Sequence, residues 1–211
     1  MPATRDIRAV VFDCDGVMFD TLKANITYYN DLLHHCGRPS MAQEQLAFIH
    51  MHTVDESMAY LFSEKRLLAR AMAHRKTLDY RRYLKRMEIE PHLKPLLAAL
   101  RPSLKTAIAT NRTDTMHPLL AAFELTQAFD LVVTAADVAR PKPHPEQLFR
   151  VASGLDMTTD QLLYIGDSQL DEAAAAAAGV LFVAYGDPDL LADAHIHSLA
   201  QVPDLIRRLG A

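Results

Sequence analysis

The sequence predicts an α/β fold in which a doubly wound parallel sheet carries an inserted all-α cap domain. Short apolar runs rich in β-branched residues alternate with amphipathic helical patterns through most of the chain. This alternation is typical of a parallel, Rossmann-like sheet with helices on both faces, because parallel strands need helical crossovers. Between residues 21 and 90 the alternation stops, and several helical patterns follow one another without a strand.

Apolar runs mark the expected strands of the core. The first, Ala9–Phe12, is continuously apolar and ends at Asp13, as is typical of a strand buried on both faces. The other expected strands are residues 106–110, 131–134, 162–166 and 180–184, with a short edge strand around His195 and His197. The helical patterns between them cover residues 116–123, 146–153 and 170–178.

The interrupting segment predicts a separate helical cap. Its helical patterns cover residues 21–35, 41–50, 55–62 and 65–87, and Thr21 is the expected N-cap of the first helix. We therefore expect core at residues 1–17, the cap at 18–92 and the remaining core at 93–211. The cap should carry specificity, because it has to close over a site that is otherwise open to water. Its candidate contact residues, each interpreted as structural when taken alone, are Tyr29, His50, His52, Thr53 and Arg75.

Composition supports a globular protein and argues against a nucleic-acid partner. The chain has 211 residues, of which 50% are apolar and 23% charged, and its net charge is −4 without a single basic block. Nucleic acid is therefore not an expected partner. The densest basic cluster lies on a helical pattern and is interpreted as a solvated face: Arg81, Arg82, Lys85 and Arg86.

Cysteine content and hydropathy indicate the compartment. Cys14 and Cys36 are too few for a disulfide framework, which favours a reducing, cytoplasmic setting. No apolar run approaches the roughly 20 residues of a membrane span, and no N-terminal stretch resembles a signal peptide. We expect a cytoplasmic protein without a membrane partner, as a monomer or a homodimer.

Polar residues follow the expected strands where ligands bind in open parallel sheets, outside the carboxyl ends. The first strand leads into Asp13-Cys14-Asp15-Gly16, the second into Thr110-Asn111, and the fourth into Gly166-Asp167-Ser168 with Asp171 a turn later. After the third strand, prolines flank Lys142. Two unit charges about 4 Å apart repel by about 4 kcal/mol at an effective dielectric constant near 20. Such a carboxylate cluster needs a cation, and oxygen ligands favour Mg²⁺.

The same residues fit phosphoryl chemistry. One metal ion and one lysine can neutralise a phosphoryl group, and Gly16 lets the following backbone amides turn toward it. A carboxylate nucleophile can form an aspartyl phosphate while a neighbouring acid or base moves the protons. A single Asp at a strand end is more often a turn or helix cap. Asp171 in particular fits either a cap of the Ala-rich helix or a role beside the metal, and Asp20 is interpreted as a cap.

The motifs resemble the haloacid dehalogenase-like superfamily. Asp13-Cys14-Asp15-Gly16-Val17 matches its first motif, DxDG[TV], and Thr110-Asn111 matches its second. Lys142 within Pro-Lys-Pro matches the third motif, and the segment from Gly166 to Asp171 matches the fourth. The insertion resembles the helical cap of the phosphoglycolate phosphatase-like branch. Cys14 and Val17 depart from the commonest residues at their positions, without threatening catalysis.

The resemblance implies a role for each motif residue. Asp13 would be the nucleophile and a Mg²⁺ ligand. Asp15 would be the general acid and base, with its backbone carbonyl on the metal. Asp167 would be a direct metal ligand, and Asp171 would support the metal shell. The residues expected to hold the phosphate are Thr110, Asn111 and Lys142.

The leading hypothesis is a Mg²⁺-dependent phosphatase that hydrolyses a small phosphomonoester through an aspartyl phosphate. A sugar-phosphate mutase on the same scaffold is the first alternative. A phospho-accepting signalling domain is the second, although it would need neither the cap nor Asp15. Which phosphomonoester is the substrate stays open at this stage.

Overall fold

The computed structural model describes residues 6–209, and its centre is a six-stranded sheet with strand order β5-β4-β1-β6-β7-β8. Every pairing in this sheet is parallel. The strands are β1 (Ala9–Phe12), β4 (Lys105–Thr110), β5 (Leu131–Thr134), β6 (Leu162–Gly166), β7 (Leu181–Tyr185) and β8 (Ala194–Ile196). The predicted α/β class is confirmed, and the predicted strand bounds differ from these by one residue at most in the five main strands.

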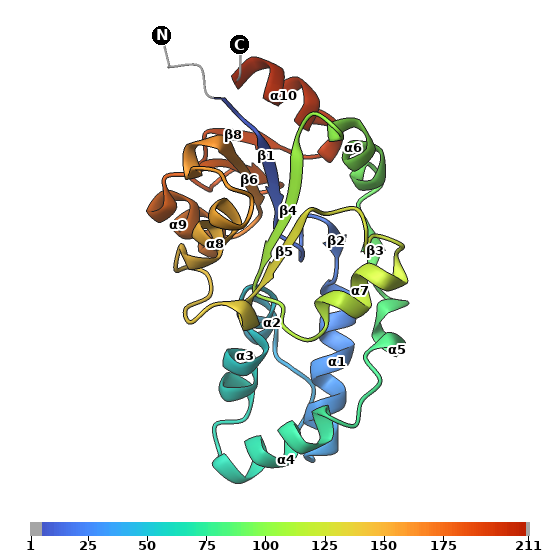
Figure 1. Ribbon diagram of the computed structural model, residues 1–211. Helices are drawn as coiled ribbons and strands as arrows, with labels where there is room; N and C mark the ends of the chain where they lie inside the picture. The colour runs from blue at the N-terminus through green and yellow to red at the C-terminus, as the bar shows by residue number, and fades with distance from the viewer. Residues whose placement is uncertain (1–5, 210–211) are drawn as a thin grey trace.

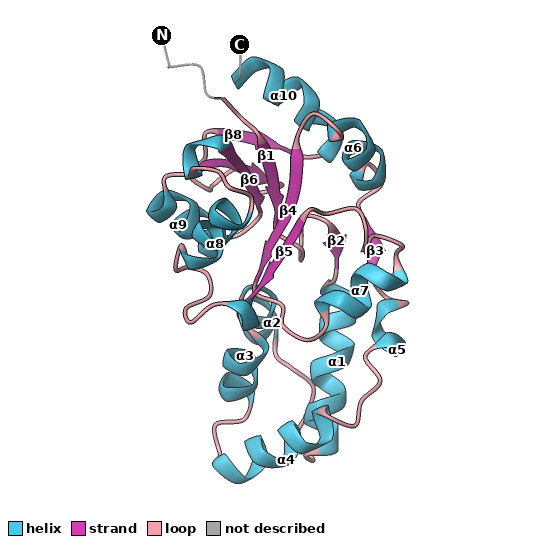
Figure 2. Ribbon diagram, viewed as in Figure 1, coloured by secondary structure: helices cyan, strands magenta, loops and turns pink. Residues whose placement is uncertain are grey.

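Helices cover both faces of the sheet, as Figures 1 and 2 show. Alternate residues of β1 enter two different apolar clusters, with Val10 and Phe12 on one face and Ala9 and Val11 on the other. One face packs against α8 (Glu146–Gly154) and α9 (Gln169–Ala178). The other cluster contains residues of α6 (Leu93–Leu100), α7 (Met116–Ala122) and α10 (Val202–Leu209). Short 3₁₀ turns are Ala135–Asp137, Thr159–Gln161 and Leu199–Gln201.

The cap lies beyond the end of the sheet at which β4 and β5 finish (Figure 1). Its helices are α1 (Leu22–His35), α2 (Gln43–Met51), α3 (Val54–Leu61), α4 (Lys65–Arg75) and α5 (Arg81–Leu84). Buried side chains of the cap, such as Leu32, Met58 and Tyr83, belong to the same apolar cluster as one face of the sheet. The cap is therefore packed continuously onto the core.

A two-stranded ribbon connects the cap to the core. β2 (Phe19–Asp20) and β3 (Glu88–Ile89) pair antiparallel, with Phe19 opposite Ile89. The sequence reading that placed no strand between residues 21 and 90 was wrong on this point. A two-residue strand is too short to produce an alternating pattern, so periodicity could not reveal it.

The expected long helix over residues 65–87 was also wrong, because the chain breaks between α4 and α5. The Thr77 hydroxyl donates to the carbonyl of His74 at 2.7 Å, and the Asp79 carboxylate accepts from the backbone N–H of Arg81 at 3.1 Å. Short polar side chains that bond nearby backbone groups compete with helical hydrogen bonds. The cluster of Arg81, Arg82, Lys85 and Arg86 is exposed, as predicted.

The start of α1 also differs from the expectation. Thr21 occupies the N-cap position, but its side chain makes no capping bond. Its hydroxyl donates to Asp15 instead. Asp20 accepts from the backbone N–H of Leu22 at 3.0 Å, so the capping role predicted for Asp20 is confirmed. Within residues 6–209, every helix is too short or too polar to cross a membrane.

Candidate active site

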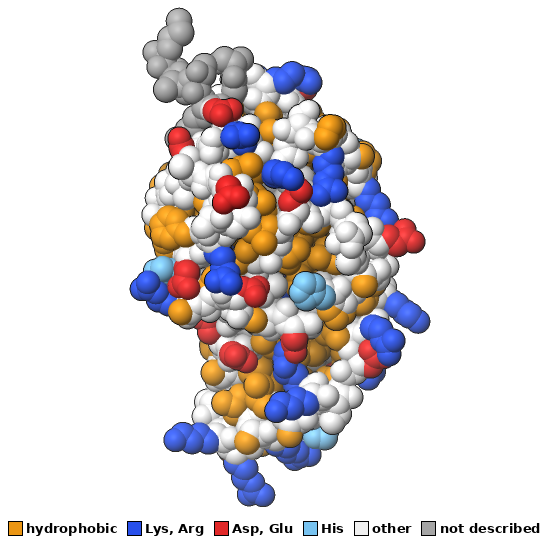
Figure 3. Space-filling view, viewed as in Figure 1, with side chains coloured by type: hydrophobic (Ala, Val, Ile, Leu, Met, Phe, Trp, Pro, Cys, Tyr) orange, Lys and Arg blue, Asp and Glu red, His pale blue; other side chains and the backbone are white. Residues whose placement is uncertain are grey.

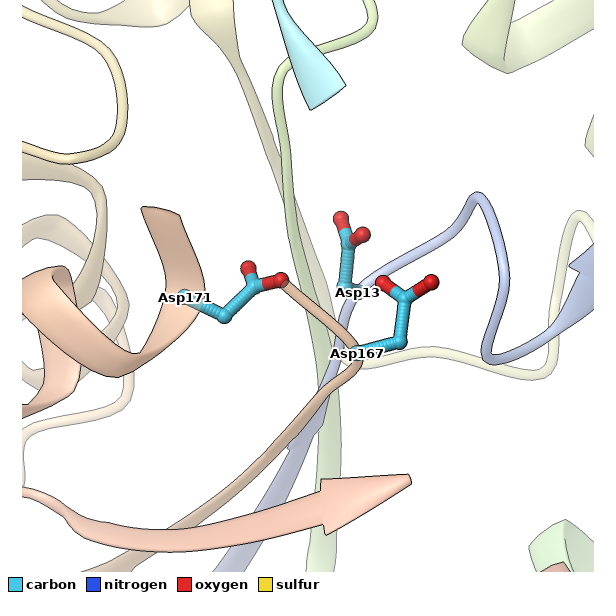
Figure 4. Close-up of side chains that lie close together, drawn as sticks. All are labelled: Asp13, Asp167 and Asp171. Atoms are coloured by element: carbon cyan, nitrogen blue, oxygen red, sulfur yellow. The ribbon is translucent and has the colours of Figure 1, made fainter. Parts of the chain in front are cut away.

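Three carboxylates meet at the carboxyl end of the sheet (Figure 4). Asp13 follows β1, Asp167 follows β6, and Asp171 lies in the first turn of α9. Each offers an oxygen, and these oxygens lie within 4.8 Å of one another. Two of the side chains, Asp13 and Asp171, are buried. The structure therefore brings together three of the residues that the motifs singled out.

Two glycines allow the carboxylates to approach so closely. Gly16 has a φ of +81°, and a Cβ added there would lie 1.8 Å from an oxygen of Asp167. A Cβ on Gly166 would lie 2.4 Å from the Cβ of Asp171. Any side chain at Gly16 would therefore need both an unfavourable backbone conformation and a displaced carboxylate.

Lys142 joins two of the carboxylates from within the core. Its Nζ is 2.7 Å from Asp13 Oδ1 and 2.6 Å from Asp171 Oδ1, and it donates to the Tyr164 hydroxyl at 2.9 Å. Only 3% of its side chain is exposed. The Asn111 amide positions the lysine backbone, because its Oδ1 accepts from the N–H of Lys142 and its Nδ2 donates to the carbonyl, both at 3.1 Å.

Asp171 caps α9, which is one of the two roles that the sequence left open for it, and the role beside a metal stays a prediction. Its Oδ2 accepts from the backbone N–H of Ser168 at 3.1 Å, and the Ser168 hydroxyl accepts from the N–H of Asp171, which completes a capping box. Its other oxygen accepts from Lys142 and, at 2.5 Å, from the Tyr164 hydroxyl. The Asp171 carboxylate is thus saturated with protein donors.

The pKa values of the three carboxyls differ because their partners differ. Burial raises the pKa of Asp13 to about 7, although the Lys142 ammonium opposes the shift. Burial, followed by repulsion from Asp13 and Asp171, raises the pKa of Asp167 to about 9. Burial alone would also raise the pKa of Asp171, but Lys142 outweighs it and the net pKa is lowered. Asp13 and Asp167 are therefore under-compensated negative groups, and this all-oxygen cluster fits a hard divalent cation.

Asp15 points to a different partner, which the sequence analysis missed. Arg112 donates two hydrogen bonds of 2.7 Å to the Asp15 carboxylate, from Nε and Nη2. The remaining Arg112 nitrogen, Nη1, donates to the Tyr80 hydroxyl at 2.8 Å and to Thr115 at 3.1 Å. Burial would raise the pKa of Asp15, but Arg112 lowers it below the usual value. Arg112 directly follows Thr110-Asn111 in the sequence, and this position was the one signal that could have marked it as a site residue.

Thr110 and Asn111 are buried at the end of β4, beside the carboxylates. The Thr110 hydroxyl accepts from the backbone N–H of Arg112 at 3.2 Å. The Asn111 amide nitrogen also donates to the carbonyl of Met51 in the cap at 3.3 Å. The Asn111 side chain therefore fixes the backbone of Lys142 and also contacts the cap.

A cavity of about 70 Å³ lies between the carboxylates and the cap. Four of the five cap residues proposed as substrate contacts line it: Tyr29, His50, His52 and Arg75. The fifth, Thr53, borders a neighbouring groove, and its hydroxyl caps α3 by accepting from Glu56 N–H at 3.3 Å. The cap thus closes over the carboxyl end of the sheet and leaves room for a small ligand.

Comparison with known proteins identifies the family. Residues 10–185 match the model of the haloacid dehalogenase-like hydrolases. The chain belongs to this family. It is also 30% identical over 206 residues to a phosphoglycolate phosphatase of Salmonella paratyphi A, covering 85% of this chain and 81% of that protein. A phosphoglycolate phosphatase of Photorhabdus laumondii is 29% identical, with 83% and 78% covered.

Solved structures of the family share the fold. A haloacid dehalogenase-superfamily hydrolase from Geobacter sulfurreducens has a TM-score of 0.79 and 34% identity, covering 96% of this chain and 97% of that one. A β-phosphoglucomutase from Clostridium difficile has a TM-score of 0.82 at 20% identity, covering 97% of both chains. The second likeness shows the fold alone, because the sequence identity is only 20%.

Proposed function

We propose that this phosphoric monoester hydrolase is a Mg²⁺-dependent phosphatase that acts on a small phosphomonoester through an aspartyl phosphate on Asp13. The observation that carries the proposal is the contact of Lys142 Nζ with Asp13 Oδ1 at 2.7 Å, beside the under-compensated carboxyl of Asp167. This arrangement supplies a nucleophile, a cation for the phosphoryl oxygens and oxygen ligands for a metal in one place.

Asp13, Asp167 and the backbone carbonyl of Asp15 would hold Mg²⁺, with Asp171 acting indirectly through Lys142 and Ser168. When bound, the ion supplies positive charge that offsets the carboxylates and the phosphate. Thr110, Asn111 and Lys142 would hold the phosphoryl oxygens. Backbone amides near Cys14, Asp15 and Gly16 would contribute further donors. The Asn111 side chain contributes by fixing Lys142.

Two proton-coupled steps complete the reaction. An oxygen of Asp13 bonds to phosphorus as the ester P–O bond breaks, and Asp15 gives a proton to the departing alcohol oxygen. Because Arg112 keeps the pKa of Asp15 low in the structure, Asp15 has to leave this ion pair and take up a proton before that step. Asp15 then takes a proton from water, whose oxygen attacks phosphorus and displaces Asp13. Arg112 orients the Asp15 carboxylate through its two hydrogen bonds.

Residues 18–92 form the cap in this proposal, and they close over the site during these steps. Phosphoglycolate is the first substrate to test, because relatives about 30% identical are phosphoglycolate phosphatases. The buried free thiols of Cys14 and Cys36 support the proposed cytoplasmic setting.

A phosphate-release screen over metabolite phosphomonoesters with Mg²⁺ tests the proposal. We expect inorganic phosphate from at least one small ester, no release with a chelator, and a loss of about 10⁴-fold or more in kcat for Asp13→Asn. Full activity in Asp13→Asn would refute the nucleophile. Transfer of phosphate between two positions of a sugar without release would support the mutase alternative instead.

A further inference from the structure

Two nitrogen atoms of the cap are buried without a hydrogen-bond partner. They are Nε of Arg75, at the end of α4, and Nδ1 of His50, in α2. Both residues line the cavity between the cap and the carboxylates. Buried polar atoms in native proteins almost always have a partner, so these nitrogens indicate a ligand on the cap side of the cavity.

The other cations that line the cavity already have partners. Lys142 is bonded to Asp13, Asp171 and Tyr164, and Arg112 uses all three of its nitrogens on Asp15, Tyr80 and Thr115. Arg75 is different, because its Nη2 donates to Asp114 at 2.6 Å and its guanidinium also hydrogen-bonds to Tyr28, while Nε has no partner. The free hydrogen-bonding capacity is therefore on the cap side, away from the nucleophile.

Arg75 is held in place by the core rather than by the cap alone. Asp114 lies in the loop after β4, and its side chain is 63% exposed, whereas that of Arg75 is 14% exposed. The ion pair thus crosses from cap to core and fixes the guanidinium at the cavity wall. The other basic residues of α4, such as Arg66 and Arg70, are exposed. Figure 3 shows Lys and Arg side chains facing solvent at the lower end of the molecule, where Figure 1 labels α4.

We propose that Arg75, assisted by His50, is the specificity-determining residue that binds a carboxylate carried by the alcohol part of the substrate. The inference rests on the proposed phosphatase function and names the chemical class of its substrate. A carboxylate is favoured over a second phosphate because Asp114 already offsets part of the Arg75 charge, so a singly charged planar group matches what remains.

The test compares two esters of similar size in the wild-type enzyme and in Arg75→Gln. Phosphoglycolate carries the carboxylate, and 2-hydroxyethyl phosphate carries a neutral hydroxyl in its place. We expect wild type to prefer phosphoglycolate in kcat/KM by about 10- to 100-fold, the range for a hydrogen bond to a charged group. Arg75→Gln should remove most of this preference by raising KM for phosphoglycolate more than KM for the neutral ester.

Matched variants separate recognition from folding. Arg66→Gln removes an exposed arginine from the same helix and should keep the preference. His50→Gln should weaken it less than Arg75→Gln does. In the Asp13→Asn background, phosphoglycolate with Mg²⁺ should raise the melting temperature, and Arg75→Gln should remove that increase.

Three results would overturn the inference while leaving the proposed function intact. The first is equal kcat/KM for the two esters in wild type, and the second is an equal loss for both in Arg75→Gln. The third is a preference for a sugar bisphosphate that depends on Arg75, which would make the recognised group a phosphate. Absence of phosphate release from any ester would instead refute the proposed function itself.

Discussion

On the core side of the cavity the charged side chains hydrogen-bond to one another, whereas on the cap side they have few protein partners. Lys142 makes three short contacts with Asp13, Asp171 and Tyr164, while Arg75 has one ion pair and His50 Nδ1 has no partner. We call the side chains on the core side of the cavity the core wall and those on the cap side the cap wall. The side chains of the core wall are therefore held in place by contacts within the protein. The cap wall leaves hydrogen-bonding capacity for a ligand, as expected where one scaffold serves many substrates.

Removing the central cation of the core wall should have the largest effect on stability. Lys142→Met leaves the buried carboxylates of Asp13 and Asp171 without their counter-ion, and we expect a loss of about 3–5 kcal/mol in the free energy of unfolding. Denaturant unfolding monitored by circular dichroism would measure it. Lys105→Met, which removes a half-exposed partner of Asp130, is the control and should cost about 1 kcal/mol or less. Similar losses in both variants would contradict the contrast between buried and exposed pairs.

The free energy of unfolding should also depend on pH and on Mg²⁺, because the carboxyls of Asp13 and Asp167 can bind either protons or the ion. The folded pKa values of Asp13 and Asp167, about 7 and about 9, lie above the ordinary value of 3.8, so the folded chain binds more protons than the unfolded chain. Without a divalent cation, their contribution to stability is therefore present below about pH 4 and is lost as pH rises toward 9. Mg²⁺ competes with these protons, so it should raise the melting temperature more at pH 8.5 than at pH 6.

Differential scanning calorimetry with Mg²⁺ or with a chelator would measure this difference. Asp167→Asn removes one of the two raised carboxyls and should reduce the response to Mg²⁺ at both pH values. A Mg²⁺ response that is independent of pH in the wild type would argue against these carboxyls as the ligands.

We expect the smallest losses of stability from variants that remove one tyrosine hydroxyl, on the core side or on the cap side of the cavity. Tyr164→Phe removes a group bonded to Lys142 and Asp171, and we expect a loss of about 1–3 kcal/mol. Tyr80→Phe removes a cap hydroxyl bonded only to Arg112, which keeps Asp15 and Thr115, so about 0.5–1 kcal/mol is expected. Thermal or urea unfolding of the two variants would rank them, and the reverse order would contradict the contrast between the walls.

The same contrast explains what the sequence could predict. Strand ends are local features, so Asp13, Thr110, Lys142 and Asp167 could be placed at one edge of the sheet from the order of strands and helices. The capping role of Asp20 was equally local. The roles proposed for these residues in catalysis stay predictions.

Features that depend on contacts between distant segments were not predicted. Arg112 meets Asp15 across 97 positions of sequence and Tyr80 of the cap across 32, and no periodic pattern reports such pairings. The Thr21 hydroxyl was assigned to its own helix but bonds to Asp15 instead. The break between α4 and α5 arises from side-chain competition at Thr77 and Asp79, which propensity alone does not resolve.

The ribbon of β2 and β3 brings the entry and exit of the cap side by side, with Phe19 directly opposite Ile89. An insertion whose two ends are neighbours can be lengthened, shortened or exchanged during evolution without moving any strand of the main sheet. The ribbon therefore fixes the point at which the cap enters and leaves the core, while the apolar cluster packs the cap against it. The chemistry of the carboxylates and the choice of substrate can then diverge at different rates within one chain.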